Sequence, residues 1–413
     1  MALSVDTGFV NANTGSTTTT ITVTAQGKAI IMFTTRQNAN GSDSANNALW
    51  TIGFSDGTNH RSIAWASDDN VATTNCGSTW RTDSALDVLD SGTPTSEARV
   101  TGVAFTDATT TTLTWNVNPS VDYLIGFIQV GGSDITNVSV GTGTLVSGST
   151  ADVAVTAPGF QPDFAMFIGT QATAAGTITR ALGTVGFAAS ADKEFTMCWG
   201  IDDAQNMTTT IDAVSYTNAA ASMSQITAGA ETIDFLANLK SFDVNGFTLA
   251  VTNAASAAWQ FGYLVIKGGQ WDVGNGTISD PEIISGMAFQ PKGLAIANTN
   301  AAADATVAIS TVTTFGVATS TSTEATVSAG QTDAVLNTAT FRATYSDSIS
   351  STGTASTKVN FTQFNSDGWQ TTSGDARTFG WFACGDAAVT IVSTMWGQRT
   401  NEPIFPKRGL NLY

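Results

Sequence analysis

Hydrophobic and polar residues alternate along much of the chain. The alternation is clear at 21–25, 113–116 and 138–141, where Thr, Asn, Ser or Gly separates the apolar residues. A period of two residues is typical of strands that bury one face. No long segment places apolar residues at helical spacing, and 233–239 is one short helical candidate. The pattern predicts an all-β protein of short strands, arranged as two-sheet sandwiches of the jelly-roll or immunoglobulin-like type.

The same landmarks recur in three stretches of the chain. A Gln-Pro opener stands at 159–163 and at 289–293, and an apolar run follows each one. A closer containing Asn-Gly or Asp-Gly comes later, at 241–249 and at 364–369, before a Gly-aromatic strand. We interpret the closer as a tight hairpin turn whose glycine has positive φ. The first stretch is more diverged, because its opener at 27–33 lacks the proline.

Landmark glycines keep nearly the same period. Gly53, Gly186 and Gly316 lie 186 − 53 = 133 and 316 − 186 = 130 residues apart. A second set keeps the same order: Gly126, Gly262 and Gly380. A period above about 100 residues indicates repeated domains rather than a solenoid. We therefore expect three β-sandwich modules of about 120–135 residues each. Their predicted bounds are 1–132, 133–270 and 271–390, followed by an extended C-terminal docking tail at 391–413.

The landmarks resemble a repeat of tailed-bacteriophage structural proteins. The second module matches it most fully, with Gly-Phe-Gln-Pro-Asp at 159–163, Phe-Asp-Val-Asn-Gly-Phe-Thr-Leu at 242–249 and an aromatic strand ending in Lys-Gly-Gly at 263–269. The third module matches at 289–292 and 365–369. The family includes tail-fibre-like and other appendage proteins. The resemblance implies a β-sandwich module of a virion, built on turn glycines and core aromatics, and it carries no catalytic residue over.

Charge and hydropathy exclude several classes of function. The net charge of −17 and a pI near 4.2 argue against nucleic-acid binding, which needs a basic face. No apolar stretch reaches the roughly 18 residues of a membrane span, and the N-terminus has neither the basic nor the apolar region of a secretion signal. We expect a protein made in the host cytoplasm and placed on the virion surface, with no membrane partner.

Few residues suggest catalysis or metal binding. His60 is the single histidine and stands in a turn-like Gly-Thr-Asn-His-Arg segment. Asp-Thr-Gly at 6–8 matches the aspartic-protease tripeptide, but a second triplet in a comparable context is missing. The acidic groups at 192–194 and 202–203 are candidates for a glycosidase carboxylate pair. We predict no catalytic residue, cofactor or metal ligand, and leave open a structural calcium at 243–246, which resembles half a calcium loop.

The three cysteines show no metal-binding or disulfide spacing. Cys76, Cys198 and Cys384 fall at different places in their modules, and no Cys-x-x-Cys occurs. Free thiols, buried or partly buried, are therefore expected.

The ten tryptophans are the main candidates for binding. Trp65 and Trp80 stand in polar segments, so we expect them to be partly exposed and able to contact a ligand such as a sugar. Trp271 opens the linker between the second and third modules and is a candidate for stapling them together. Four others stand in strand-like apolar segments and are expected in the core: Trp115, Trp199, Trp259 and Trp381.

The C-terminal segment differs from the modules because it is basic, apolar and interrupted by two prolines. Ile404, Phe405, Lys407, Arg408 and Tyr413 are candidate docking residues for an acidic partner or for a neighbour's sheet edge. Packing of this segment on its own module is an equal alternative.

The sequence favours a non-enzymatic virion structural protein, surface-exposed as an appendage, fibre or capsid decoration. Its expected partners are other virion proteins of the capsid or tail, and a homo-oligomer is expected. The alternative is an adhesin that binds a host-surface glycan, and a glycan depolymerase is a minor third hypothesis.

Overall fold

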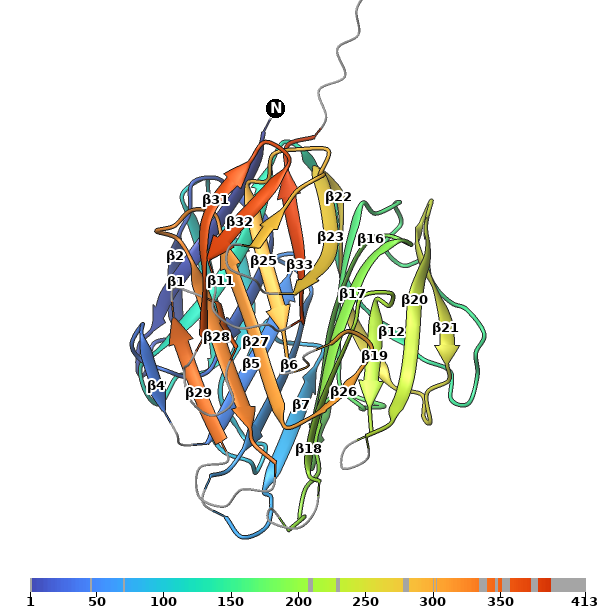
Figure 1. Ribbon diagram of the computed structural model, residues 1–413. Helices are drawn as coiled ribbons and strands as arrows, with labels where there is room; N and C mark the ends of the chain where they lie inside the picture. The colour runs from blue at the N-terminus through green and yellow to red at the C-terminus, as the bar shows by residue number, and fades with distance from the viewer. Residues whose placement is uncertain are drawn as a thin grey trace, which may run out of the picture.

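The described part of the chain consists of strands, turns and loops. The computed structural model describes residues 2–44, 47–69, 71–206, 211–227, 231–277, 282–299, 301, 303–333, 340–345, 348–350, 357–372 and 378–387. These residues form strands β1 to β33 and no helix (Figure 1), which confirms the all-β prediction. The described residues therefore include no helix that is long and apolar enough to span a membrane. The strands form six antiparallel sheets, three of seven strands and three of four strands.

The first sheet pair joins a seven-stranded sheet, β1-β11-β3-β5-β6-β7-β15, with a four-stranded sheet, β2-β10-β9-β8. Its strands are β1 (Leu3–Ala12), β2 (Thr18–Thr22), β3 (Gly27–Thr34), β5 (Ala48–Ser55), β6 (His60–Ser67), β7 (Cys76–Arg81), β8 (Leu86–Leu89), β9 (Ser96–Phe105), β10 (Thr110–Val117), β11 (Tyr123–Gly132) and β15 (Gly176–Ile178).

The second sheet pair has the sheets β12-β22-β14-β16-β17-β18-β26 and β13-β21-β20-β19. Its strands are β12 (Ile135–Thr144), β13 (Val153–Val155), β14 (Phe164–Gly169), β16 (Ala181–Ser190), β17 (Lys193–Ile201), β18 (Ala213–Asn218), β19 (Met223–Ile226), β20 (Ile233–Asp243), β21 (Gly246–Asn253), β22 (Gln260–Gly268) and β26 (Val307–Ile309). The helical candidate at 233–239 is thus wrong, because it lies in β20.

The third sheet pair has the sheets β23-β33-β25-β27-β28-β29-β4 and β24-β32-β31-β30. Its strands are β23 (Gln270–Thr277), β24 (Glu282–Ile284), β25 (Gly293–Asn298), β27 (Thr311–Ala318), β28 (Ala325–Gln331), β29 (Thr340–Tyr345), β30 (Ser348–Ser350), β31 (Thr357–Asn365), β32 (Gly368–Thr372), β33 (Thr378–Gly385) and β4 (Ser42–Ser44).

Each seven-stranded sheet ends in a short strand supplied by another part of the chain. β15 lies between β14 and β16 in sequence but pairs with β7 of the first sheet. In the same way β26 pairs with β18, and β4 pairs with β29 (Figure 1). The second pair thus extends the first, the third extends the second, and the first extends the third. The exchange forms a closed cycle, and we call each junction between two sheet pairs a seam.

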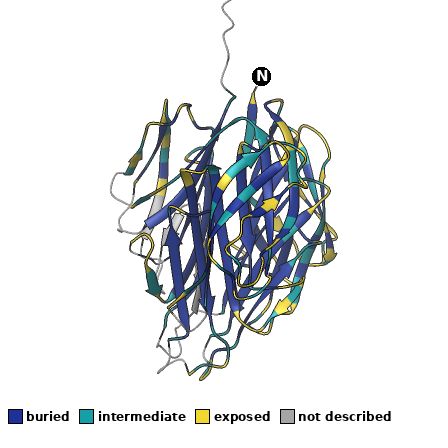
Figure 2. Ribbon diagram, turned by 90° about the vertical axis from the view of Figure 1, so that its right-hand side faces the viewer, coloured by how far each residue is buried: buried dark blue, intermediate teal, exposed yellow. Residues whose placement is uncertain are grey.

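Two kinds of hydrophobic core result from this arrangement. Apolar residues between the seven-stranded and four-stranded sheets form a separate core inside each pair, as expected of sandwiches. One further core contains residues from all three seven-stranded sheets and lies where those sheets face each other. Buried positions run along the long strands, whereas exposed positions gather in loops and on the outer strands (Figure 2). The seven-stranded sheets are therefore covered on both faces.

The closer glycines are needed for a reason that differs from the predicted one. Gly246 begins β21 and Gly368 begins β32, both directly after a hairpin turn, but neither has positive φ. A Cβ on Gly246 would lie 1.9 Å from the carbonyl oxygen of Val155, and one on Gly368 would lie 1.9 Å from that of Ile284. The prediction of a hairpin is confirmed, and close approach of a neighbouring strand selects the glycine.

Candidate functional site at the seams between the sheet pairs

Aromatic rings from different sheet pairs pack against each other at every seam. The ring centroids of Trp50 and Trp199 are 5.1 Å apart at the seam between the first and second pairs. Those of Phe187 and Phe382 are 5.1 Å apart between the second and third pairs. A further contact joins the third and first pairs: Phe33 and Phe315, at 5.0 Å. Each edge-to-face pair at such a separation stabilises the folded protein by about 0.5–1.5 kcal/mol in addition to the effect of the buried apolar area.

Trp271 staples the second and third sheet pairs, as the sequence predicted. Its ring stacks on Phe164 at 4.4 Å with an interplanar angle of 18°. Its Nε1–H donates to the carbonyl oxygen of Gly268 at 2.8 Å. The four tryptophans expected in the core are also buried: Trp115, Trp199, Trp259 and Trp381.

Trp65 and Trp80 are not exposed, so the expectation of partly exposed binding aromatics is wrong. Their exposed fractions are 1% and 0%. Trp80 donates its Nε1–H to Gln260 Oε1 at 3.0 Å across a seam, and Trp65 lies 6.5 Å from Trp199. Both rings are part of the central core. The polar neighbours in sequence were misleading, because β6 and β7 are covered on both faces and their small polar residues are buried as well.

Two grooves open at equivalent places on two of the seams. One of about 490 Å³ is lined by Gln161, Asp163, Lys193, Trp271 and Asp272 among others. The other, of about 420 Å³, has equivalent strands and turns around it, including the residues Gln26, Lys28, Asp56 and Phe105. Both volumes lie in the range of small-ligand sites.

The polar side chains of the larger groove already bond to the protein itself. Gln161 Nε2 donates to the carbonyl oxygen of Phe242 at 2.8 Å. Asp163 Oδ2 accepts the N–H of Gly268 at 2.7 Å, and Lys193 forms an ion pair with Asp272 at 2.8 Å across the seam. The Lys193–Asp272 pair joins the two sides of the seam, and a ligand would have to compete with each of these contacts.

The smaller groove shows the same use of its polar groups. Gln26 Nε2 donates to the carbonyl oxygen of Phe105 at 2.9 Å, the counterpart of the Gln161 contact. Lys28 Nζ donates to the carbonyl oxygen of Ile135 across the seam. Asp56 Oδ2 accepts the N–H of Val140 at 3.0 Å, again across the seam. The grooves are therefore features of the repeat, with side chains that join neighbouring sheet pairs.

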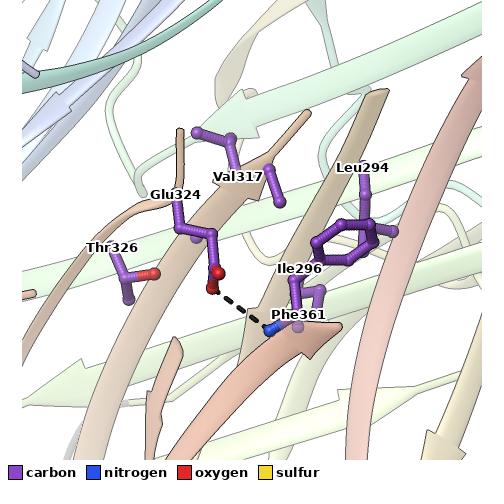
Figure 3. A pocket seen from close by; sticks show the side chains of 8 residues that line it. Leu294, Ile296, Val317, Glu324, Thr326 and Phe361 are labelled. Atoms are coloured by element: carbon purple, nitrogen blue, oxygen red, sulfur yellow. Dashed lines mark hydrogen bonds between the residues drawn. The ribbon is translucent and has the colours of Figure 1, made fainter. Parts of the chain in front are cut away.

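One hairpin position carries a titratable residue in all three sheet pairs. Register places His60, Glu194 and Glu324 at the same point of β5–β6, β16–β17 and β27–β28. Glu194 Oε2 accepts the N–H of Leu239 at 2.5 Å. Glu324 Oε2 accepts the N–H of Phe361 at 3.1 Å (Figure 3). Each glutamate thus binds the backbone of the facing four-stranded sheet, beside a register shift in β20 or β31.

His60 is 8% exposed, so this hairpin residue is buried rather than exposed in a turn. Its Nδ1 lies 2.8 Å from Ser55 Oγ, on the paired strand β5. Burial lowers the pKa of His60, which keeps the imidazole neutral. The equivalence indicates a structural role for His60 and for Glu194. Glu194 fastens its hairpin to the opposite sheet, and His60 is buried at the same hairpin position.

Replacing Glu194 with glutamine is expected to remove part of the pH dependence of stability. Burial raises the pKa of Glu194 from 4.5 to about 7, although the Leu239 N–H favours the charged form. Between those values the folded protein holds a proton that the unfolded chain has lost, so stability falls as pH rises through this window. Glutamine keeps the acceptor oxygen without titrating.

The measurement is the free energy of unfolding in urea from about pH 4.5 to about pH 7.5. Over this range the free energy of unfolding of the wild type should fall by on the order of 2 kcal/mol more than that of Glu194→Gln. Asp192→Asn at the exposed hairpin tip is the control and should keep the wild-type slope. Equal slopes for the wild type and Glu194→Gln would show that Glu194 is not buried in its neutral form.

The Asp-Thr-Gly tripeptide at 6–8 has a packing role. Gly8 faces Phe127 on the neighbouring strand, and Gly141 and Gly274 face Tyr263 and Trp381 in the same register. A Cβ on Gly141 would lie 2.1 Å from the Tyr263 hydroxyl oxygen. The glycine accommodates an aromatic ring from the adjacent strand, an arrangement known to stabilise sheets. Asp6 Oδ1 accepts both the N–H and the hydroxyl of Thr24.

The other candidate groups are also engaged in the fold. Asp202 pairs with Arg180 at 3.0 Å, and Asp203 Oδ1 accepts the N–H of Cys76 at 3.1 Å across a seam. Asp243 accepts the hydroxyls of Ser241 and Thr248. In the described ranges no group of three or more His, Cys, Asp or Glu is placed to hold a metal ion.

All three cysteines are free and buried, as predicted. Burial raises the pKa of Cys198 and of Cys384 to about 12, which leaves these thiols unreactive near neutral pH.

The predicted docking residues Ile404, Phe405, Lys407, Arg408 and Tyr413 lie outside the described residues. Comparison with protein-family models, curated proteins and solved structures finds no match to this chain.

Proposed function

We propose that this chain is a non-enzymatic structural protein of a tailed-bacteriophage particle, exposed on the particle surface as an appendage, a fibre or a capsid decoration. The observation that carries the proposal is the closed cycle of strand exchange around one shared core. Opening any seam would break backbone strand pairing and would at the same time separate packed aromatic rings. Local opening therefore has a high free-energy cost. Resistance to local opening suits a particle component that must survive outside a cell.

The use of the landmark residues supports the same proposal. The openers and closers bound strands, the repeated glycines admit neighbouring rings or carbonyl groups, and Trp271 joins two sheet pairs. Among the candidate catalytic residues, Glu194 fastens a hairpin to the facing sheet, and His60 is buried at the equivalent hairpin position. Together with the resemblance of the openers and closers to phage appendage repeats, this favours a building block over an enzyme. Its partners would be other virion proteins of the capsid or tail.

We do not extend the carbohydrate-binding alternative. That hypothesis rested on Trp65 and Trp80, which are buried in the central core. The polar side chains of the two seam grooves described above bond to the protein across or beside the seams.

The direct test is high-resolution imaging of purified particles of the source virus, with peptide mass spectrometry of the same preparation. The proposal predicts peptides from this chain and density that fits three joined sandwiches. Density over the capsid lattice would identify a decoration protein, and density confined to the tail or to one vertex would identify an appendage. Absence of the chain from intact, infectious particles would overturn the proposal.

A further inference from the structure

Buried polar side chains from all three sheet pairs meet in one chain of hydrogen bonds. Ser67 ends β6, Asp212 immediately precedes β18 and Gln331 ends β28; all three are fully buried. Ser67 Oγ donates to Gln331 Oε1, and Gln331 Nε2 donates to Asp212 Oδ2 at 2.9 Å. One oxygen of the Asp212 carboxyl is thereby fixed by the third sheet pair.

A second carboxyl group, that of Asp333, crosses the same seam. Its Oδ1 accepts the N–H of Asp212 at 2.7 Å and the N–H of Ala213 at 3.3 Å. The N–H of Asp333 donates in turn to Ser310 Oγ at 3.1 Å. Asp333 therefore binds the start of β18 in the second sheet pair and is itself held by the third.

The remaining oxygen of Asp212, Oδ1, is buried and accepts no N–H or O–H from the described residues. The Asp333 carboxyl lies beside Asp212, because its Oδ1 accepts the Asp212 N–H at 2.7 Å. Two carboxylates cannot form a hydrogen bond with each other, because both would be acceptors, but a carboxylic acid can donate to a carboxylate. Burial and the neighbouring Asp333 raise the pKa of Asp212 to about 8.

We propose that Asp212 carries a proton that locks the seam between the second and third sheet pairs, its O–H donating to the carboxylate of Asp333. Loss of the proton places a buried negative charge beside that of the half-buried Asp333 and converts an attractive contact into a repulsive one. The second and third sheet pairs are therefore held together more strongly in mildly acidic solution than in alkaline solution.

The charged groups around the pair offer no replacement for the proton. The N–H of Asp202 donates to the Asp212 carbonyl oxygen at 2.8 Å, and the Asp202 carboxylate is already paired with Arg180. Asp203 and the Cys76 thiol lie at the adjoining seam, and neither can supply positive charge. Deprotonation of Asp212 is thus not neutralised by these neighbours.

The repeat itself provides the comparison for this contact. Asp203 stands two residues after β17 as Asp333 stands two residues after β28, and each accepts the N–H of the first residue of a partner strand, Cys76 or Ala213. The residue before Cys76 is Asn75, where the residue before Ala213 is Asp212. The seam between the first and second pairs thus has an amide at the position where the seam between the second and third pairs has a carboxyl, and the Asn75 amide donates to Asp68.

The sign of the pH effect follows from proton binding. Folding raises the pKa of Asp212 from 3.8 to about 8. At pH values between these two pKa values, the folded protein holds a proton that the unfolded chain has released. Stability from this contact is complete below the lower value and is lost as pH rises through the upper one.

The test is the apparent Tm of the full chain from about pH 5 to about pH 9.5, for the wild type, Asp212→Asn and Asp203→Asn. Over this range the Tm of the wild type should fall by several degrees more than the Tm of Asp212→Asn. Asp203→Asn should show the same dependence of Tm on pH as the wild type. Equal slopes for the wild type and Asp212→Asn would overturn the proposal. So would a gain in wild-type Tm at alkaline pH on adding calcium chloride that Asp212→Asn does not share, because the pair would then hold a cation.

A second measurement keeps the proposal testable if Asp212→Asn does not fold. Infrared difference spectra of Glu194→Gln between about pH 6 and about pH 9.5 report protonated carboxyl groups without the contribution of Glu194. The proposal predicts loss of one carboxylic-acid C=O band on raising the pH, and absence of that band at the lower pH would contradict it.

Discussion

Replacing Trp199 with alanine is expected to lower the free energy of unfolding by about 3–5 kcal/mol, the cost of truncating a fully buried aromatic side chain. Trp199 is buried in the central core and lies over Gly183 of its own sheet, 2.1 Å from where a Cβ would stand. It also contacts Trp50 and Trp65 of the first sheet pair. Equilibrium urea unfolding measures the effect. Val244→Ala, at a site that is 77% exposed, is the control and should change stability by less than about 0.5 kcal/mol.

A double-mutant cycle separates the contact across the seam from simple loss of core volume. Trp50→Leu and Trp199→Leu should be coupled by about 0.5–1.5 kcal/mol, because the two rings touch. Trp50→Leu and Trp259→Leu should be additive, since Trp259 belongs to the internal core of the second sheet pair. Additivity of the first pair would show that the two sheet pairs do not share a core in solution.

The second large effect is expected from adding one methyl group at a seam. Gly380 lies in β33 of the third sheet pair, and a Cβ there would lie 2.0 Å from the ring of Phe195 in the second. Phe195 is fully buried and stacks on Phe187, so its ring has no open space to enter. Gly380→Ala should therefore destabilise the protein by about 1–3 kcal/mol or more.

Gly169→Ala is the matched control, because Gly169 is also a buried strand glycine and a Cβ there would meet its nearest atoms only at 3.5 Å. It should change the free energy of unfolding by less than about 1 kcal/mol. Thermal or urea unfolding of both variants decides the question. If Gly380→Ala were as mild as Gly169→Ala, the third and second sheet pairs would not be in the close contact described above.

Much of the local structure could be predicted from the sequence. Alternation identified strands, and the landmarks identified hairpins, because these features depend on residues near each other in the chain. The core role of Trp199 also followed from its apolar surroundings, and the staple role of Trp271 followed from its place at the boundary between the second and third modules.

The seams could not be predicted in the same way. The exchanged strands β4, β15 and β26 are each three residues long, and their partners lie far away in sequence. A three-residue segment such as Gly176–Ile178 has no periodicity that distinguishes it from a loop. Burial on both faces removes alternation as well, which is why Trp65 and Trp80 were assigned to the surface.

The hairpin position of His60, Glu194 and Glu324 did carry a signal in the sequence. The three residues follow the landmark glycines Gly53, Gly186 and Gly316 by 60 − 53 = 7, 194 − 186 = 8 and 324 − 316 = 8 residues. Aligning the repeats on those glycines places the single histidine beside two glutamates. The role of the glutamates was nevertheless hidden, since the backbone N–H that Glu194 or Glu324 binds lies on a distant strand of the opposite sheet.

Differential scanning calorimetry of the intact chain tests most directly whether the three sheet pairs form one body. Because each seam combines strand pairing with a shared core, we predict a single transition whose calorimetric and van't Hoff enthalpies agree. Two or three separate transitions, or a van't Hoff enthalpy well below the calorimetric one, would show that the sheet pairs unfold independently and would contradict the closed cycle on which the proposed structural role depends.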